Sequence, residues 1–489
     1  MNLVNYKLIL LINSFSKEEI ELFRKFISSP FFTKGRNYIP FLDNVIKLKS
    51  FRNNTKNSIK YKKEKLPAAD SGKNFSEQTL RNRYSELYKL GEEFLINLGL
   101  SEKKAEKDKI LLGKLLERKL YIPYSIRYKE TFKQLHIEKF EKKKFQNLTS
   151  LAEMNSHFLH DKNKIDQIYT EFYESSNIKL CLNLIDFFET GYEFAQQEFD
   201  SRKFEPNYVL NFLKDLNAEE MMKSFSRSSN VIFKVTAMNY FLYKAFENEN
   251  EVTYYTKAHK IFKRLFGELK DSYKVKIFNH MINFCIRKLN LGFKEFRNDL
   301  FELYNEKLEQ KLISDLKSTA YLFNYFREYV YIGLSLYKYE WVEKFIEKYS
   351  DELPEEMRED ETSLSYAKLN LAKGKFERSL KYLENIKPTY YLLYIDSSLI
   401  RLCNHYELEN YEEAYFELDR LKHYLRNHKE IPAVHRITIA NFVKTYQKLL
   451  KYVTNPANDE SGFILNEIES MKLVGKKDWL IKKIIELDN

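Results

Sequence analysis

The residue pattern closest to a metal site is the pair His157-x-x-His160, followed by Asp161. On a helix the two histidines lie on one face, where imidazole nitrogens can bind a transition metal. Structural zinc sites use four ligands, and no third residue is spaced to converge on this pair. We therefore interpret the histidines as an exposed pair and predict no metal ligands.

Catalytic motifs of other kinds are missing from the sequence. No two glycines are close enough for a Gly-x-Gly turn or a phosphate-binding loop, and neither His-Glu-x-x-His nor Cys-x-x-Cys occurs. Acidic pairs such as Glu18/Glu19 and Glu412/Glu413 are typical of helix N-termini, where negative charge is favourable to the helix dipole. We predict no catalytic residue, no cofactor and no enzymatic activity. An enzyme of unrecognised type is the third of three functional hypotheses.

The N-terminal 150 residues are strongly basic. They contain 32 Lys and Arg against 17 Asp and Glu, whereas the whole chain has a net charge of +11. Solvated helix faces in a lysine-rich protein are one explanation, and a surface for an acidic partner is the other. Nucleic-acid binding through this region is the second hypothesis. The candidate contact residues are Lys49, Arg52, Lys56, Lys60, Lys62, Lys63 and Lys65.

The composition indicates the secondary structure of the chain. The chain has 12 Gly and 9 Pro among 489 residues, but 38 Phe and 36 Tyr. Tight turns and strand corners use glycine and proline, so a chain poor in both has little material for hairpins of strands. Apolar residues recur at helical spacing, for example at Leu80, Tyr84 and Leu87. We predict an all-α fold in which helical hairpins form an α-solenoid behind an N-terminal helical domain.

Local patterns predict several helix ends. Ser16 and Glu19 form a capping box before a helix. Residues 49–75 combine many lysines with a Pro- and Gly-containing cluster, which predicts an exposed loop. A further helix break is predicted near Ser175.

A 35-residue period relates Trp341, Phe376 and Tyr411. Gly374 can take the left-handed position that ends a helix, and Ser379 is small where two helices must approach. This pattern resembles the tetratricopeptide repeat, a two-helix unit of about 34 residues, over about residues 325–430. The resemblance implies TPR-like helical hairpins. The repeat-forming positions are Trp341, Gly374, Phe376, Ser379, Tyr411 and Ala414.

These patterns divide the chain into four segments. Residues 1–100 form a basic N-terminal helical domain with the loop 49–75, residues 101–324 form irregular helical repeats, residues 325–455 form TPR-like repeats, and residues 456–489 form C-terminal capping helices. The first hundred residues also resemble uncharacterised helical bacterial proteins, which implies no activity.

The leading hypothesis is a non-catalytic protein–protein interaction scaffold. Stacked helix pairs form a concave surface on which Phe and Tyr side chains can hold a peptide or helix of a partner protein. The three cysteines lie about a hundred residues apart, which is neither a metal-binding spacing nor a disulfide framework. We therefore expect a cytoplasmic protein, and no segment approaches the length of a membrane span.

Overall fold

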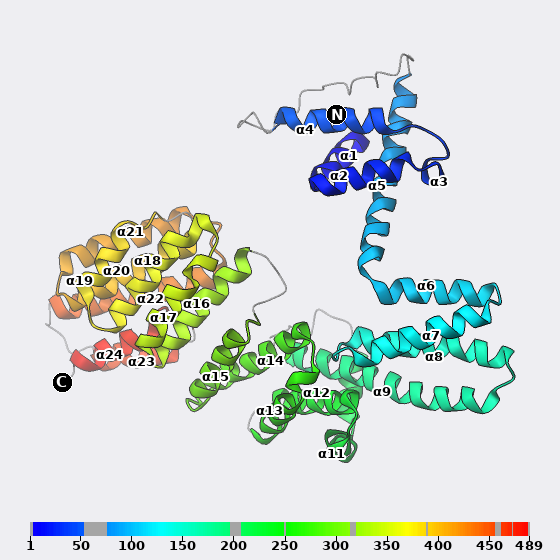
Figure 1. Ribbon diagram of the computed structural model, residues 1–489. Helices are drawn as coiled ribbons and strands as arrows, with labels where there is room; N and C mark the ends of the chain where they lie inside the picture. Colours follow the sequence, from blue (N-terminus) through cyan, green and yellow to red (C-terminus); the bar gives the residue numbers. More distant parts are fainter. Residues whose placement is uncertain are drawn as a thin grey trace. The chain divides into compact units, whose positions relative to one another are not determined.

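The computed structural model describes residues 3–52, 76–195, 207–248, 251–312, 319–387, 390–454, 461–471 and 473–487. These residues form 24 α-helices and two short 3₁₀ turns (Figure 1), and no strand occurs among them. The one backbone bridge between Phe140 and Leu269 is isolated. The predicted all-α fold is therefore confirmed.

Contacts between residues group the chain into two compact units, which are described separately. The first unit comprises Met1–Glu138 and Lys142–Leu182. Its helices are α1 (Leu3–Ser14), α2 (Lys17–Ser28), α3 (Pro30–Thr33), α4 (Ile39–Arg52), α5 (Glu77–Glu102), α6 (Lys104–Glu117), α7 (Tyr121–Ile137), α8 (Lys142–Asp161) and the first part of α9 (Ile165–Ala195).

The second unit comprises Lys139–Glu141 and Asn183–Asn489. After the end of α9 it contains α10 (Tyr208–Asp215), α11 (Glu219–Arg227), α12 (Val231–Glu247), α13 (Thr253–Leu265), α14 (Asp271–Asn290), α15 (Phe296–Glu309), α16 (Thr319–Ser335), α17 (Tyr339–Tyr349), α18 (Glu355–Ala372), α19 (Phe376–Glu384), α20 (Tyr391–Glu407), α21 (Tyr411–Asn427), α22 (Ala433–Thr454), α23 (Ser461–Ser470) and α24 (Lys477–Leu487).

The capping box at the start of α2 is confirmed. The backbone N–H of Glu19 donates to Ser16 Oγ at 3.1 Å, and the Ser16 N–H donates to Glu19 Oε2 at 2.7 Å. Two other boundary predictions need correction. α4 continues to Arg52, so the first residues of the predicted loop 49–75 are helical, and residues 53–75 lie outside the described structure. The predicted break at Ser175 is wrong, because α9 runs through it without interruption.

One backbone motif ends seven helices. A residue with positive φ donates its N–H to the carbonyl three residues earlier, and the next N–H reaches the carbonyl five residues earlier. This is the Schellman motif, which satisfies carbonyls that have no partner inside the helix. Glycine holds the positive-φ position in only two of the seven cases, which is how so few glycines serve so many helix ends. The positions are Lys119, Asn163, Gly292, Lys311, Tyr337, Gly374 and Glu409.

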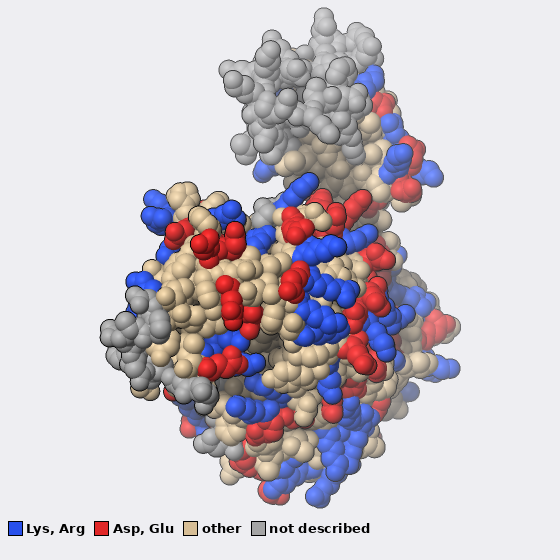
Figure 2. Space-filling model, turned by 90° about the vertical axis from the view of Figure 1, so that its left-hand side faces the viewer, with Lys and Arg blue, Asp and Glu red and all other residues tan. Residues whose placement is uncertain are grey.

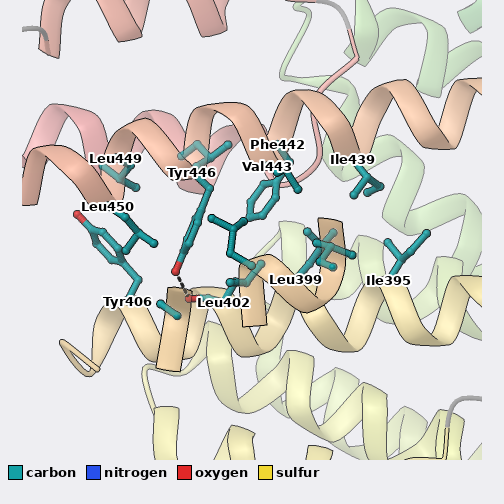
Figure 3. Packing of buried hydrophobic residues seen from close by; sticks show 14 of the residues in the cluster. Ile395, Leu399, Leu402, Tyr406, Ile439, Phe442, Val443, Tyr446, Leu449 and Leu450 are labelled. Atoms are coloured by element: carbon teal, nitrogen blue, oxygen red, sulfur yellow. Dashed lines mark hydrogen bonds between the residues drawn. The ribbon is translucent and has the colours of Figure 1, made fainter. Parts of the chain in front are cut away.

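A cluster of buried apolar residues joins the C-terminal helices around α20, α21 and α22 (Figure 3). Leu402, Phe442 and Tyr446 are buried there, and the ring centroids of the two aromatic residues lie 5.3 Å apart. The Tyr446 hydroxyl donates to the Leu402 carbonyl at 2.7 Å. The tyrosine ring thus fills the core, while its buried hydroxyl finds an acceptor on the neighbouring helix.

Candidate interaction surface

The first part of α9 carries an apolar stripe that faces solvent. Tyr169, Phe172 and Tyr173 have exposed fractions of 70%, 67% and 71%, and Ile165 and Leu180 are exposed as well. At about 100° per residue, these five side chains lie within one sector of about 100° around the helix axis. Helices of folded proteins normally turn such a stripe toward the core, and contiguous exposed apolar surface marks interaction sites.

The side of α9 that meets α8 combines polar contacts with buried apolar residues such as Leu182. Asn155 Nδ2 of α8 donates to Glu171 Oε1 at 2.5 Å, and Ser175 is buried on the same side. Burial raises the pKa of the Glu171 carboxyl above its usual range, although the hydrogen bond from Asn155 opposes this change. Lys179 of α9 also pairs with Glu153 of α8 at 2.6 Å. Polar contacts therefore hold α9 on α8, while its aromatic side faces outward.

The C-terminal part of α9, which belongs to the second unit, shows how the same sector behaves when it is covered. Phe187 packs edge-on against Phe212 of α10, with ring centroids 5.6 Å apart. A Cβ added to Gly191 would lie 2.6 Å from the Tyr243 ring and 2.8 Å from Leu213. Along this part of α9 the sector is thus covered closely by other helices.

A second aromatic surface runs along one side of α21. It is a groove of about 450 Å³, to which α20 contributes Tyr394. The Tyr424 ring stacks on Tyr394 with centroids 3.7 Å apart and on His428 at 3.9 Å. Phe416 at one end of the groove has an exposed fraction of 64%. The other lining side chains come from α21 and from His428, which follows it. They form two rows at four-residue steps: Phe416, Arg420, Tyr424 and His428, and Asp419, His423 and Asn427.

An ionic network joins α16, α18 and α20. Arg327 Nε and Nη2 each lie 2.7 Å from a carboxylate oxygen of Glu361, and its Nη1 lies 3.2 Å from Asp396 Oδ2. Lys368 Nζ approaches the same Asp396 oxygen at 2.8 Å, and the Tyr390 hydroxyl donates to Glu361. These interactions satisfy each charge with an opposite charge.

The pKa of Asp396 falls below its usual range even though burial opposes this change, because Lys368 and Arg327 attract the ionised form. A carboxylate held ionised in this way is a poor general base. We therefore read the network as a structural link between helices.

The predicted basic contact surface falls largely outside the described structure. Lys49 and Arg52 lie in the last turn of α4, and their side chains are not described. The other five residues, Lys56, Lys60, Lys62, Lys63 and Lys65, lie outside the described residues. Figure 2 shows Lys and Arg interspersed with Asp and Glu on the face it draws.

The repeat-forming residues lie at the starts of second helices, with one change of register. Phe376 and Tyr411 are the first residues of α19 and α21, and both are half-buried. α17 begins at Tyr339, so Trp341 is its third residue instead of the equivalent of Phe376. The residues in left-handed conformation are equivalent in the two hairpins, because Tyr337 lies two residues before the start of α17 and Gly374 two residues before the start of α19.

Two residues of extra length explain this shift. One lies between the starts of α17 and α18, where the 3₁₀ turn Ser350–Glu352 intervenes, and one lies in α18, which has 18 residues against 17 in α20. The 35-residue period therefore holds from Gly374 to Glu409 but becomes 37 from Tyr337 to Gly374.

Small residues occupy the helix contacts as the pattern predicted for α19 and α21. Ser379 and Ala414 each stand three residues after the helix start, and both are fully buried. Ser379 Oγ donates to the Ala367 carbonyl of α18 at 2.8 Å. The third residue after the start of α17 is Val342, which is larger. It faces Gly333 of α16, so the small residue of this hairpin lies on the other helix.

The described residues hold no group of three His, Cys, Asp or Glu side chains that could bind a metal ion. His157 and His160 are both exposed on α8, as the interpretation of an exposed pair predicted, and all three cysteines are buried. None of the helices in the described ranges combines the length and apolar character needed to cross a membrane.

Sequence reasoning missed both aromatic surfaces. The residues of the α9 stripe recur at three- and four-residue steps, but the expected break at Ser175 hid their continuity. The four-residue rows of α21 are also visible in the sequence, yet spacing alone does not tell an exposed row from a buried one.

Comparisons with known proteins add no relative. No family model, no curated protein and no solved structure matches the chain.

Proposed function

We propose that the chain is a non-catalytic protein-interaction scaffold that binds an amphipathic helix of a partner protein on the aromatic stripe of α9. The observation that carries this proposal is the exposed aromatic stripe of α9, formed by Tyr169, Phe172 and Tyr173 on the side of the helix away from α8. Large aromatic side chains contribute most to binding energy when a partner buries them.

The charge around the stripe indicates what the partner helix carries. Residues 165–180, which the stripe spans, contain Asp166, Glu171 and Glu174 against one basic residue, Lys179, whose ammonium group pairs with Glu153. Asp166 is exposed beside the stripe. A partner helix with an apolar face and a basic edge therefore matches both its shape and its charge. The TPR-like assignment of the C-terminal repeats supports the same class of function, since such hairpins are binding platforms in general.

A selection from a displayed library of helical peptides on the full-length protein tests this proposal. Peptides with apolar faces and basic edges should be enriched, and Phe172→Ala and Tyr173→Ala should each weaken their binding at least tenfold. The matched control is Tyr331→Ala, which removes an equally exposed tyrosine from α16. Because all three side chains are exposed, none of the changes should unfold the protein.

Other outcomes identify other occupants. If Phe172→Ala converts a dimer to a monomer in light scattering, a second copy of this chain covers the stripe. If the selected peptides respond to Phe416→Ala in the α21 groove but not to changes in the stripe, the binding surface lies on the C-terminal repeats and our assignment is wrong.

A further inference from the structure

Lys307, near the end of α15, is a buried amine without a buried carboxylate as hydrogen-bond partner. Its exposed fraction is 1%. The ε-nitrogen lies 2.8 Å from Asn279 Oδ1 of α14 and also meets the Tyr325 hydroxyl of α16. It lies 4.1 Å from the centroid of the Tyr325 ring. Both hydrogen-bonding partners are uncharged, whereas buried lysines are normally paired with a negative charge.

The amine borders a small apolar cavity. The lining includes Phe326, Tyr329, Phe345 and Leu353, and the volume is about 30 Å³. On the measure in which one water needs about 10–15 Å³, this is room for about two water molecules. A ligand of two or three non-hydrogen atoms therefore fits beside the amine.

Two carboxylates face this region from neighbouring elements. Glu328 of α16 accepts a hydrogen bond from the Tyr304 hydroxyl at 3.0 Å, and Glu352 lines the cavity from the 3₁₀ turn. Burial lowers the pKa of Lys307 to about 7, because the attraction of Glu328 offsets only part of its effect. About half of the Lys307 side chains are therefore neutral at pH 7, compared with fewer than about one in a thousand ordinary lysines.

We propose that Lys307 is a reactive amine that forms an imine with a small aldehyde in this cavity. A neutral, desolvated amine beside a hydroxyl is the arrangement that activates lysine as a nucleophile toward carbonyl groups. The assignment goes beyond the scaffold function and does not depend on it.

The reaction requires no oxidant or reductant. The Lys307 nitrogen attacks the carbonyl carbon, and the carbonyl oxygen takes a proton from the Tyr325 hydroxyl, which recovers one from the attacking amine. The carbinolamine then loses its hydroxyl group with a proton as water, which leaves a carbon–nitrogen double bond. Protonation makes the imine a cation, which the negative charge of Glu328 and the face of the Tyr325 ring favour.

Reductive trapping tests the proposal on the full-length protein. The protein is incubated at pH 7 with one equivalent of acetaldehyde and with cyanoborohydride, which reduces an imine to an N-ethyl amine. Peptide mass spectrometry should find Lys307 modified at least tenfold faster than Lys311, an exposed lysine four residues later. The rate at Lys307 should level off above about pH 7, whereas the rate at Lys311 should keep rising to pH 9.

Two variants separate chemistry from position. Tyr325→Phe should slow modification of Lys307 and leave that of Lys311 unchanged, and Lys307→Arg should remove the adduct from this peptide. If either variant fails to fold, the comparison of the two lysines in the unaltered protein still decides. Equal rates at Lys307 and Lys311, or a rate at Lys307 that rises continuously to pH 9, would overturn the proposal.

Discussion

Gly333 of α16 faces Val342 of α17 so closely that a Cβ built on the glycine lies 2.5 Å from Val342 Cγ2. Ser379 and Ala414, which stand at the same step after the starts of α19 and α21, are small. In the α16/α17 hairpin the residue at this position of the second helix is the larger Val342, and Gly333 of the first helix leaves room for it. In this hairpin the small residue thus lies on the first helix and the larger one on the second.

This contact predicts a rescue between two substitutions. Gly333→Ala should lower the free energy of unfolding by about 1–3 kcal/mol, because the stiff, buried valine cannot move aside. Val342→Ala leaves a small cavity and should also destabilise. Together the two changes should cost at least about 0.5 kcal/mol less than their sum. Urea unfolding followed by tryptophan fluorescence suits the measurement, because both tryptophans, Trp341 and Trp479, lie in the C-terminal helices. Strict additivity would mean that the two residues do not compete for space.

The link between Arg327 and Glu361 predicts a second coupling. Arg327→Met should cost about 3–5 kcal/mol, because it leaves the fully buried Glu361 carboxylate without its ionic partner. Replacing both residues, with Glu361→Leu added, should recover most of that loss. The exposed pair Lys114 and Glu117 provides the control, since Lys114→Met should change stability by less than about 1 kcal/mol. A double variant as unstable as Arg327→Met alone would contradict this interpretation.

The helix ends that use non-glycine residues predict a stabilising change. Lys311 has a φ of 53°, in the left-handed region that costs most residues about 1 kcal/mol. Lys311→Gly should therefore raise the free energy of unfolding by about 0.5–1 kcal/mol, whereas Gly374→Ala, at a φ of 72°, should lower it by a similar amount. The control Lys260→Gly, in the interior of α13, should cost about 1 kcal/mol. Destabilisation by Lys311→Gly would show that its side chain contributes more than its backbone costs.

Lys307 predicts a dependence of stability on pH. Its pKa is about 7 in the folded protein and close to 10.5 when unfolded. Between these values the unfolded chain binds more protons, so the contribution of Lys307 to stability is complete above pH 10.5, falls as the pH decreases, and stays at its minimum below pH 7. Relative to Lys307→Met, the unaltered protein should gain about 1.4 kcal/mol per pH unit between pH 7.5 and 9.5. Urea unfolding at both pH values measures this, and parallel behaviour of the two proteins would refute the low pKa.

Much of the fold could be predicted because it depends on local patterns. Helical spacing and the scarcity of glycine and proline indicated the all-α class, and the Ser16 capping box predicted the start of α2. These features act within a few residues of sequence. The wrong position predicted for Trp341 also follows from reliance on a local pattern. A fixed period of 35 residues does not allow for one residue added in a link and one added in a helix.

The candidate surface could not be predicted, for a physical reason. The spacing of Tyr169, Phe172 and Tyr173 predicts an apolar side on α9, and the normal rule places that side inward. The other side of α9 carries Leu182 as well as Glu171, and it is this side that is buried, with Glu171 bonded to Asn155 of α8. Which side of an amphipathic helix is buried is decided by residues on a neighbouring helix, and no local pattern contains that information.

The Arg327 guanidinium bonds to Glu361 of the following hairpin and to Asp396 of the one after it. In a linear array each unit is normally coupled only to its immediate neighbours, so the ends can peel away one hairpin at a time. A side chain that reaches the second neighbour removes that freedom. The hairpins α16/α17, α18/α19 and α20/α21 should therefore open as a single cooperative block, and amide hydrogens in all three should exchange at one common rate.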